Sequence, residues 1–312
     1  YAMEVSSLRA SWHMRKTEEF ATTFDDLETR SDMDIATAIL DAQDHGLAAA
    51  RSAIPVLTVA AQAAAAQLRE HPNGRIVYGG AGTSIRLGVQ DGVELAPTFG
   101  WPNSRLAYLI AGGPDALIRT AEGAEDNSRQ ALRDAAAIGI GPADVCITLS
   151  ASGVTPYTLA TCGAARNAGA ITIGIANNPD APLLTAAEYP ILLDSGPEPI
   201  GGSTRMTAGT TQKVALNLLS SLVMIRLGRV YCGMMVDVIA SNEKLRERAV
   251  RIVMASADVD EDAARSALAT CGNAAKPAVL VARGLPSDAA DQLLDAHAGD
   301  LRAALATLGE DG

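Results

Sequence analysis

The chain has 312 residues, of which 48% are hydrophobic and 20% are charged, so it can build a full core and is not a wholly disordered protein. It carries 25 Lys and Arg against 36 Asp and Glu, which gives a formal net charge of −11 and a pI of about 4.8. This acidic balance argues against nucleic acid as the main partner, because neutralising phosphates requires clustered basic residues, but it leaves small anionic ligands open.

Four cysteines and four histidines are scattered along the chain, without a CxxC pair or a local metal-ligand motif. We therefore expect free thiols in a reducing compartment and no metal site. No apolar run reaches the roughly 18 residues of a membrane helix, and the start of the sequence lacks a signal-peptide pattern. The expectation is a soluble, cytoplasmic protein that contacts no membrane. Residues 1–13 look irregular, and we expect them to include vector-derived sequence.

The segment 14–56 and the residues just after it have the apolar spacing of helices. The pattern predicts helices over 32–40 and 47–69, with Pro55 in the first turn of the second, where its missing N–H does no harm. From 57 to 239, short Val-, Ile- and Leu-rich runs alternate with amphipathic segments. These runs predict five strands buried on both faces, over 75–78, 106–111, 145–149, 171–175 and 191–193.

This alternation predicts an α/β fold: a doubly wound, mainly parallel five-stranded sheet with helices on both faces, whose ligands bind beyond the carboxyl ends of the strands. The helices between the strands are expected over 85–92, 114–123, 127–137, 157–168 and 211–227. The region 240–312 reads as mostly helical, with helices over 242–254 (capped by Asn242), 261–270 and 287–298. One further strand is expected over 278–282.

Two loops that follow predicted strands are rich in glycine and hydroxyl side chains. The first strand ends in GGAGTS (79–84), and the third ends in SASGVTPY (150–157), with a proline placed to begin a helix. Backbone N–H groups at a helix start bind anions, and glycine permits a close approach of the ligand. A tight turn with Ser84 as N-cap explains the first loop equally well on its own. Two such loops on one rim favour a phosphate site.

The two loops together resemble the sugar isomerase (SIS) domain, which binds phosphosugars. GTSIRLG (82–88), AEGAED (121–126), SASGVTPY (150–157), GSTRMTAGTTQK (202–213) and MMVDVIASNEKL (234–245) occur in the order seen in N-acetylmuramic acid 6-phosphate etherases, and the resemblance covers about 17–304. It implies that phosphosugar is bound by Gly82, Thr83, Ser84, Ser150, Ser152, Gly153, Thr155 and Arg205. For Arg205, a structural ion pair is an equally good interpretation.

The resemblance also implies the chemistry. Such etherases remove D-lactate from C3 of the phosphosugar by elimination and addition of water, giving N-acetylglucosamine 6-phosphate without a cofactor. Two carboxyls in different protonation states can act as base and acid. By resemblance these are Glu125, the base at C2, and Glu94, the acid for the lactate oxygen. Without the family, both read as solvated surface carboxylates. A homodimer whose N-terminal helices reach the neighbour's site is also implied, as is a role in cell-wall recycling.

Several positions depart from the family pattern. Ile85 replaces a glycine, Val154 an arginine, Thr207 a lysine, His45 a lysine and Ala21 an asparagine. We expect Ile85 to fill space beside the phosphate loop. Each lost charge-assisted hydrogen bond is worth roughly 1.5–3 kcal/mol, so anion recognition should be weaker.

These departures keep three alternatives open. The first is an etherase-like enzyme that acts on a different phosphosugar. The second is a phosphosugar-binding regulatory protein of the glucokinase-regulatory-protein type, which retention of Glu94 and Glu125 opposes. The third is a ketose–aldose isomerase, which shares proton abstraction at C2 but needs no leaving group.

Overall fold

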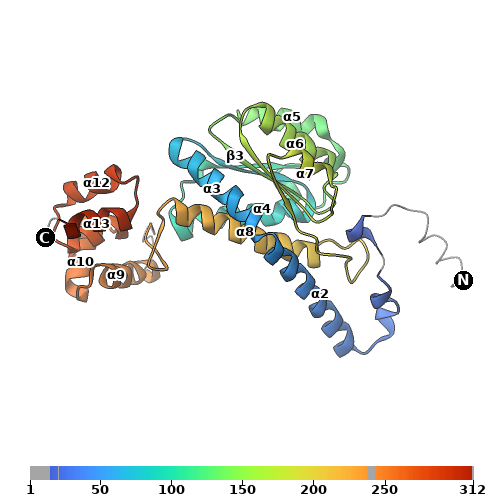
Figure 1. Cartoon of the computed structure of the whole chain (residues 1–312), viewed down its shortest axis with the longest axis horizontal. Coiled ribbons are helices and arrows are strands. Elements are labelled where there is room, and N and C mark those ends of the chain that lie inside the picture. Colours follow the sequence, from blue (N-terminus) through green and yellow to red (C-terminus); the bar gives the residue numbers. More distant parts are fainter. Residues whose placement is uncertain (1–14, 20, 238–242, 311–312) are drawn as a thin grey trace, which may run out of the picture. The chain divides into compact units, whose positions relative to one another are not determined.

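The computed structural model describes residues 15–19, 21–237 and 243–310, and its ribbon is drawn in Figure 1. The chain forms two compact units that interleave along the sequence. The first comprises Tyr1–Val59, Val77–Val89 and Tyr108–Leu216, and the second comprises Ala60–Ile76, Gln90–Ala107 and Asn217–Gly312. The expected irregularity of residues 1–13 and the expected cap at Asn242 lie outside the described residues.

A five-stranded sheet is confirmed, with the strand order β2-β1-β3-β4-β5. Its strands overlap the predicted ranges: β1 Ile76–Gly80, β2 Leu106–Ile110, β3 Val145–Ser150, β4 Ile171–Ala176 and β5 Tyr189–Leu192. β3 runs parallel to β4 and β4 runs parallel to β5. Every residue of β1 and β3 is buried, as expected for strands that are covered on both faces.

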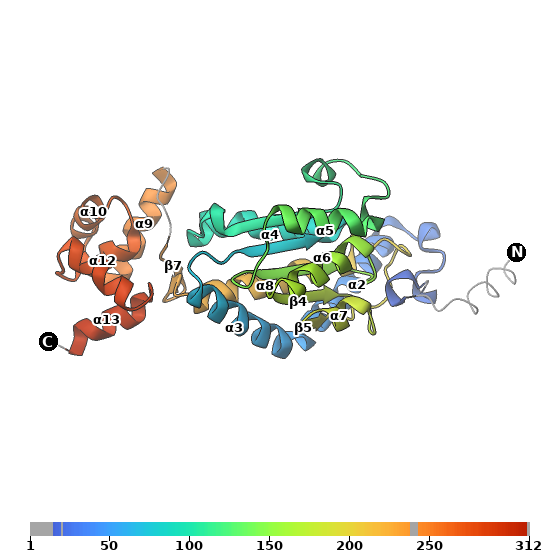
Figure 2. The same cartoon turned by 90° about the horizontal axis from the view of Figure 1, so that it is seen from above.

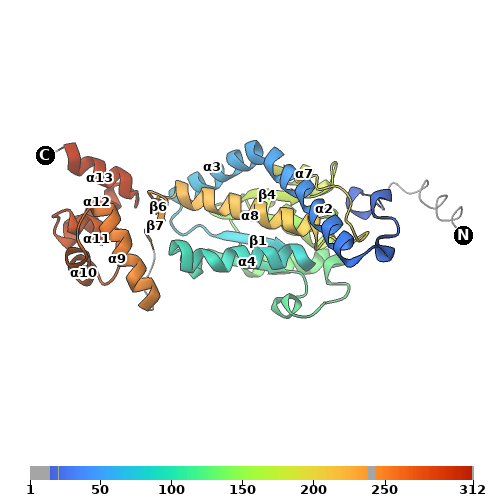
Figure 3. The ribbon, with the colours of Figure 1, turned by 90° about the horizontal axis from the view of Figure 1, so that it is seen from below.

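Helices cover both faces of the sheet. Figure 2 shows α5 (Ser128–Ala137) and α6 (Pro156–Asn167) in front of it, and Figure 3, from the opposite side, shows α4 (Gly82–Phe99) and α8 (Thr207–Arg226). The contacts of two glycines agree with this. A Cβ on Gly79 of β1 would lie 2.6 Å from Cγ2 of Thr161 on α6, whereas one on Gly88 of α4 would lie 3.3 Å from side chains of the sheet. The sheet is therefore wound on both sides.

Two further helices precede the sheet in the chain, α2 (Asp32–Ser52) and α3 (Ile54–Glu70). The hydroxyl oxygen of Ser31 accepts a hydrogen bond from the N–H of Asp34, which caps α2. Pro55 lies in the first turn of α3, as predicted, but the break between the two helices falls at Ala53 and not over 41–46 as the predicted ranges imply. No single described helix is long and apolar enough to span a membrane, although α2 and α3, as a bent pair, meet the same length and composition criteria together.

The helix predicted over 114–123 is wrong. The structure has one short 3₁₀ turn there, η5 (Pro114–Leu117), and a second, η6 (Ala124–Asp126), lies just beyond the predicted range. Gly113 and Gly123, which directly precede these turns, have φ angles of 75° and 70°, in the left-handed region that a continuous helix cannot include. The segment after β2 is therefore an irregular loop.

The strand predicted over 278–282 is also wrong, because these residues belong to helix α11 (Ala275–Ala282). A short apolar run is compatible with a buried helix as well as with a strand, and periodicity cannot separate the two. Here Val279 and Leu280 are fully buried in the core of a helical bundle. The other helices of this bundle are α9 (Glu243–Ala257), α10 (Glu261–Thr270), α12 (Ser287–Ala296) and α13 (Leu301–Glu310).

The bundle is preceded by a small hairpin that the sequence patterns did not predict, formed by β6 (Val230–Tyr231) and β7 (Met234–Met235). Asp237, two residues after β7, is bound to the bundle by Lys276. The Nζ atom of Lys276 donates hydrogen bonds to Oδ2 of Asp237 at 2.7 Å and to the carbonyl of Gly299 at 2.8 Å. Because Lys276 is buried, its pKa is lowered.

Candidate functional site

A cavity of about 380 Å³ lies at the carboxyl ends of β1 and β3, within the first unit. Loop 81–84, which begins α4, and loop 150–156, which follows β3, form much of its lining. Glu125 and Asp126 of η6, Arg15 and Glu18 of the N-terminal segment, and Thr204 complete it. Its volume falls in the range of roughly 300–1,000 Å³ that is typical of small-molecule sites.

The first loop presents the start of α4 to this cavity. The helix begins at Gly82, so Ser84 lies within the first turn and is not the N-cap. The first N–H groups of an α-helix have no partner inside the helix and carry the positive end of its dipole. Close packing brings this loop to its place, because a Cβ on Gly80 would lie 2.7 Å from the carbonyl oxygen of Leu149 on β3. The loop therefore offers N–H groups and hydroxyls to an anion.

The second loop carries a cluster of three hydroxyls. The Oγ atom of Ser150 lies 3.2 Å from Oγ of Ser152 and 2.9 Å from Oγ1 of Thr155, and it accepts a hydrogen bond from the N–H of Gly153 at 3.0 Å. Thr155 is the N-cap residue of α6, but its side chain makes no capping hydrogen bond. Helix α6 begins at Pro156, as predicted. The hydroxyls and the helix start thus share one rim with the first loop.

Glu125 lies where two cavities meet. It lines the cavity of the two loops, and it also lines an adjoining cavity of about 300 Å³ that contains Arg86. The guanidinium of Arg86 is held in place by two carbonyls, since Nε donates to Leu117 at 3.1 Å and Nη2 donates to Ala116 at 3.0 Å. A ligand that fills both cavities would therefore pass the carboxylate of Glu125.

Some residues predicted from the sequence lie elsewhere. Glu94 is on α4, about three turns after Gly82; its side chain is exposed, and it is not among the residues that line the cavity. Arg205 is exposed on a turn, next to the lining residue Thr204. Gly153 is buried and shapes the loop. The predicted residues that do line the cavity are Gly82, Thr83, Ser84, Glu125, Ser150, Ser152 and Thr155.

Only one of the five departures from the family pattern lines this cavity in the described part of the chain, and that is Val154. Ile85 is 2% exposed and does not line the cavity; it packs beside the first loop, since a Cβ on Gly80 would lie 3.5 Å from Cβ of Ile85. Thr207 is 1% exposed at the start of α8. Ala21 and His45 line a different cavity of about 870 Å³. Of the three positions at which the family has a lysine or arginine and this chain does not, 154 is therefore the one that lines this cavity.

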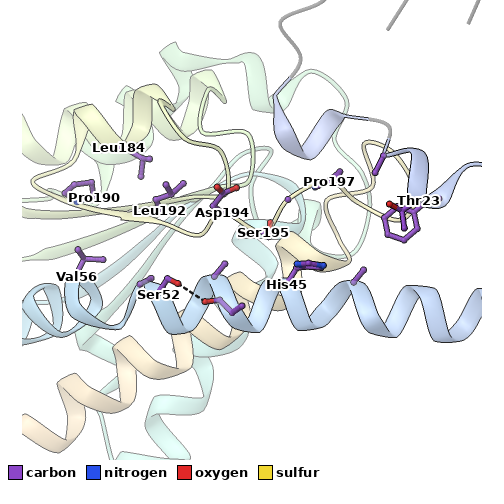
Figure 4. Close-up of a pocket in the computed structure, with 17 residues that line it drawn as sticks. Thr23, His45, Ser52, Val56, Leu184, Pro190, Leu192, Asp194, Ser195 and Pro197 are labelled. Carbon is purple, nitrogen blue, oxygen red and sulfur yellow. Dashed lines mark hydrogen bonds between the residues drawn. The ribbon is translucent and has the colours of Figure 1, made fainter. Parts of the chain in front are cut away.

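The larger cavity is mainly apolar (Figure 4). It lies between α2 and the loop that follows β5, and Val56, Leu184 and Leu192 contribute to its lining. Its polar lining includes His45 on α2 and, in the loop after β5, Asp194 and Ser195 (Figure 4). It contains neither of the glycine- and hydroxyl-rich loops, so it is not the predicted phosphate site.

A buried carboxyl group accepts hydrogen bonds from the start of α8, three residues after Thr204 in the chain. Glu198 is 1% exposed, and its two oxygens accept hydrogen bonds from the N–H groups of Thr207 at 2.8 Å and Ala208 at 2.9 Å. Burial raises the pKa of Glu198, and the two backbone N–H groups act in the opposite direction. Within the described residues, no group of three or more His, Cys, Asp and Glu side chains is placed to hold a metal ion.

Two family models match the chain. The model of the glucokinase regulatory protein N-terminal SIS domain matches residues 58–166, and the SIS domain model matches residues 127–222. Together with the parallel sheet, they confirm the predicted SIS fold.

The chain is also similar to curated proteins over nearly its whole length. It is 48% identical over 292 residues to an N-acetylmuramic acid 6-phosphate etherase of Deinococcus radiodurans, a match that covers 93% of this chain and 95% of that protein. It is 41% identical to the etherase of the same name from Streptomyces avermitilis, covering 96% of each. Among solved structures, a phosphoheptose isomerase from Francisella tularensis matches 63% of this chain and 98% of its own, at 18% identity and a TM-score of 0.47.

Proposed function

Because the chain belongs to the N-acetylmuramic acid 6-phosphate etherase family, we propose that it cleaves the D-lactyl ether of N-acetylmuramic acid 6-phosphate. The observation that carries this proposal is the position of Glu125, which lies on the rim of a cavity formed by two hydroxyl-rich helix starts. Such a cavity suits a phosphate, and a carboxylate beside it suits proton abstraction from the attached sugar.

In this proposal the 6-phosphate binds to the loops after β1 and β3. Ser84 and Ser150 lie deepest, with 8% and 4% of their surfaces exposed, and Thr83, Ser152 and Thr155 lie nearer the opening. Hydroxyls and N–H groups donate to phosphate oxygens without adding charge. A phosphate can therefore bind in a protein whose net charge is −11.

The reaction is an elimination followed by an addition. In the open-chain aldehyde the carbonyl acidifies the proton on C2, and Glu125 removes it. The electron pair forms the C2–C3 double bond as the C3–O bond to lactate breaks, and an acid protonates the departing oxygen. Water then adds its oxygen to C3 and a proton returns to C2. The net reaction consumes one water and gives D-lactate and N-acetylglucosamine 6-phosphate.

We assign the acid role to Glu94. Support for this assignment comes from the motif around it, in which Glu94 precedes Pro97 and Thr98 as in the family. Its carboxyl is exposed on α4 and so is accessible to a ligand or to a second subunit. Which glutamate is the base and which is the acid can be tested, because exchange of the C2 proton with solvent needs the base but not the acid.

The lactyl carboxylate is a second anion, and the adjoining cavity offers it a cation. Arg86 donates two of its N–H groups to carbonyls, which fixes the guanidinium and leaves other N–H groups for a carboxylate. With the phosphate among the hydroxyls and the lactyl group beside Arg86, the reacting carbons lie near Glu125, which both cavities share. This arrangement matches the two ends of the substrate.

We also propose the biological setting that the family implies. The enzyme acts in the cytoplasm, in cell-wall recycling, as a homodimer whose N-terminal helices reach the neighbouring site. The exposed apolar residues Met33, Leu40 and Leu47 of α2 support a partner for this helix, since they repeat at seven-residue spacing on one face.

The test is incubation of the protein with N-acetylmuramic acid 6-phosphate while D-lactate is measured. In water enriched in ¹⁸O, elimination and addition place the label in the sugar at C3 and none in the lactate. Binding without release of lactate would favour a regulatory protein, which the match to the glucokinase regulatory protein model alone supports. Release of a different leaving group would mean an etherase with another substrate, as the loss of a cation at Val154 allows.

A further inference from the structure

We propose that Arg15 supplies the cation of the phosphate cavity, at a position that none of the family motifs includes. The inference deepens the proposed function and depends on it for the identity of the ligand. It assigns a specificity role to a short N-terminal segment, Arg15–Glu19, which lies more than 60 residues before the first phosphate loop.

The first step is the charge of the cavity. Among the described lining residues, Arg15 is the single Lys or Arg, and it faces three carboxylates: Glu18, Glu125 and Asp126. Its guanidinium forms no hydrogen bond or ion pair with another described residue. Without Arg15, a doubly charged phosphate would enter a cavity in which the charged side chains of the described residues are all carboxylates. An arginine fork can donate two parallel hydrogen bonds to a phosphate and offsets this repulsion.

The second step is the anchor that holds the segment in place. Thr17 is fully buried, its N–H donates to Oδ1 of Asn178 at 3.2 Å, and its hydroxyl accepts from Nδ2 of Asn178 at 2.9 Å. The same Nδ2 donates to the carbonyl of Ala151 at 2.8 Å. Since Ala151 belongs to the loop after β3 and itself lines the cavity, Asn178 connects the N-terminal segment directly to the phosphate loop.

The third step is the direction of the neighbouring side chains. Lys16 does not line the cavity; its Nζ donates to Oδ2 of Asp194 at 2.7 Å, and this hydrogen bond raises the pKa of Lys16. Glu18 does line the cavity, and its Oε2 would lie 3.1 Å from a Cβ on Gly202. Residues 16 and 17 therefore fasten the segment to the protein, while Arg15 and Glu18 face the ligand.

This placement explains how the chain can lack an arginine at position 154. Val154 lines the same cavity, so a guanidinium introduced from the N-terminal segment serves the same space as the one that is missing from the loop. Loss of a charge-assisted hydrogen bond corresponds to a roughly ten- to hundredfold loss in affinity. We expect a loss of affinity in that range when Arg15 is replaced by an uncharged residue.

The experiment measures binding by calorimetry with the full chain. The probes are N-acetylglucosamine 6-phosphate and, as its uncharged counterpart, N-acetylglucosamine. Arg15→Gln should weaken binding of the phosphorylated probe ten- to hundredfold and leave the unphosphorylated one unchanged, and Arg15→Lys should fall between. The matched control is Arg129→Gln, which removes an exposed arginine of α5 outside the cavity lining and should change neither constant. Unchanged affinity in Arg15→Gln overturns the inference, as does a wild-type chain that does not bind the phosphorylated probe.

Two further readouts separate this inference from the proposed reaction. Thr17→Val removes the hydroxyl that Asn178 donates to, so it should weaken binding of the phosphorylated probe without changing any charge. Equal affinity in Thr17→Val and wild type would contradict the anchoring step. If the wild type releases D-lactate but Arg15→Gln has an unchanged KM, the proposed function stands and the inference fails. If binding falls in Arg15→Gln while the wild type releases no lactate, the inference stands and the proposed reaction fails.

Discussion

Gly153 and Ala181 are packed so closely that a Cβ on Gly153 would lie 2.3 Å from Cβ of Ala181. Gly153 also has a φ of 69°, which side chains disfavour, and its carbonyl accepts a hydrogen bond from the N–H of Leu183 at 3.1 Å. The loop with the three hydroxyls is thus closed against the segment after β4. This packing alone requires glycine at 153.

Gly153→Ala should therefore destabilise the protein by at least about 1–3 kcal/mol, the usual cost of a strained backbone residue. The control is Gly163→Ala on α6, where a Cβ would meet nothing within 4 Å and where alanine should stabilise the helix by up to about 1 kcal/mol. Urea unfolding of both variants gives the comparison. Equal stabilities would show that the loop can move away from Ala181.

Glu125→Gln should reduce kcat about 10²- to 10⁴-fold, because a positioned base contributes that much, while leaving affinity for the phosphorylated sugar close to normal. The control is Asp115→Asn, an exposed carboxylate that does not line either of the two cavities. Steady-state release of D-lactate and calorimetric binding provide the two measurements. A large loss of affinity with unchanged kcat would assign Glu125 to binding instead.

Glu94→Gln distinguishes the acid from the base. If Glu125 takes the C2 proton, a Glu94→Gln variant should still exchange that proton with deuterium from heavy water, although it releases little lactate. Glu125→Gln should lose both exchange and release. Proton NMR of the substrate follows the exchange directly. The opposite pattern, with exchange lost in Glu94→Gln and kept in Glu125→Gln, would reverse the two assignments.

Val154→Arg should restore a second cation to the phosphate cavity. Since Val154 lines the cavity, we expect binding of a phosphorylated sugar to tighten roughly ten- to hundredfold, the gain of one charge-assisted hydrogen bond. Val154→Gln is the control, because it adds length and hydrogen-bonding capacity without charge. Isothermal calorimetry at two salt concentrations measures the effect, and the gain should shrink at the higher one. No difference between arginine and glutamine would mean that charge at 154 does not reach the ligand.

The pH dependence of Glu198 has a definite sign. Burial raises its pKa above the ordinary value of 4.5, so the unfolded carboxyl ionises first as the pH rises from 4.5. The free energy of unfolding should then fall until the pH passes the raised pKa and stay level above it. Glu198→Gln lacks this decline. Urea unfolding of both proteins from pH 4.5 to 7.5 should show the wild type losing stability relative to the variant. A relative gain would mean that the N–H groups of Thr207 and Ala208 outweigh the burial.

The sheet could be predicted because each strand corresponds to a local pattern in the sequence. β1 and β3 are continuous apolar runs that end in glycine and hydroxyl residues, and both buried strands and helix starts leave such traces in sequence. The run 278–282 shows the limit, since the same apolar pattern fits the buried helix α11. What decides between the two is the set of neighbours, and a single run of sequence does not contain it.

Arg15 and Glu18 could not be found from the sequence for a related reason. They reach the cavity through the contact of Thr17 with Asn178, which are 161 residues apart in the chain. No spacing or composition near residue 15 signals that contact. Glu125 differs from them, because the family resemblance names it, but its place in the cavity still depends on the fold of η6, which no local pattern predicts. Local patterns predict the phosphate loops, whereas the charged groups around them depend on tertiary structure.

The hydrogen bonds between Glu198 and the start of α8 affect which helix starts are free to bind an anion. The N–H groups of Thr207 and Ala208 are already occupied by an internal anion, so this helix has its own counter-ion whether or not ligand is present. In the proposed phosphate site, the helix starts among the described lining residues are those of α4 and α6. The start of α8 is thus bound by a carboxyl group of the protein itself, so in this proposal it does not compete for the phosphate.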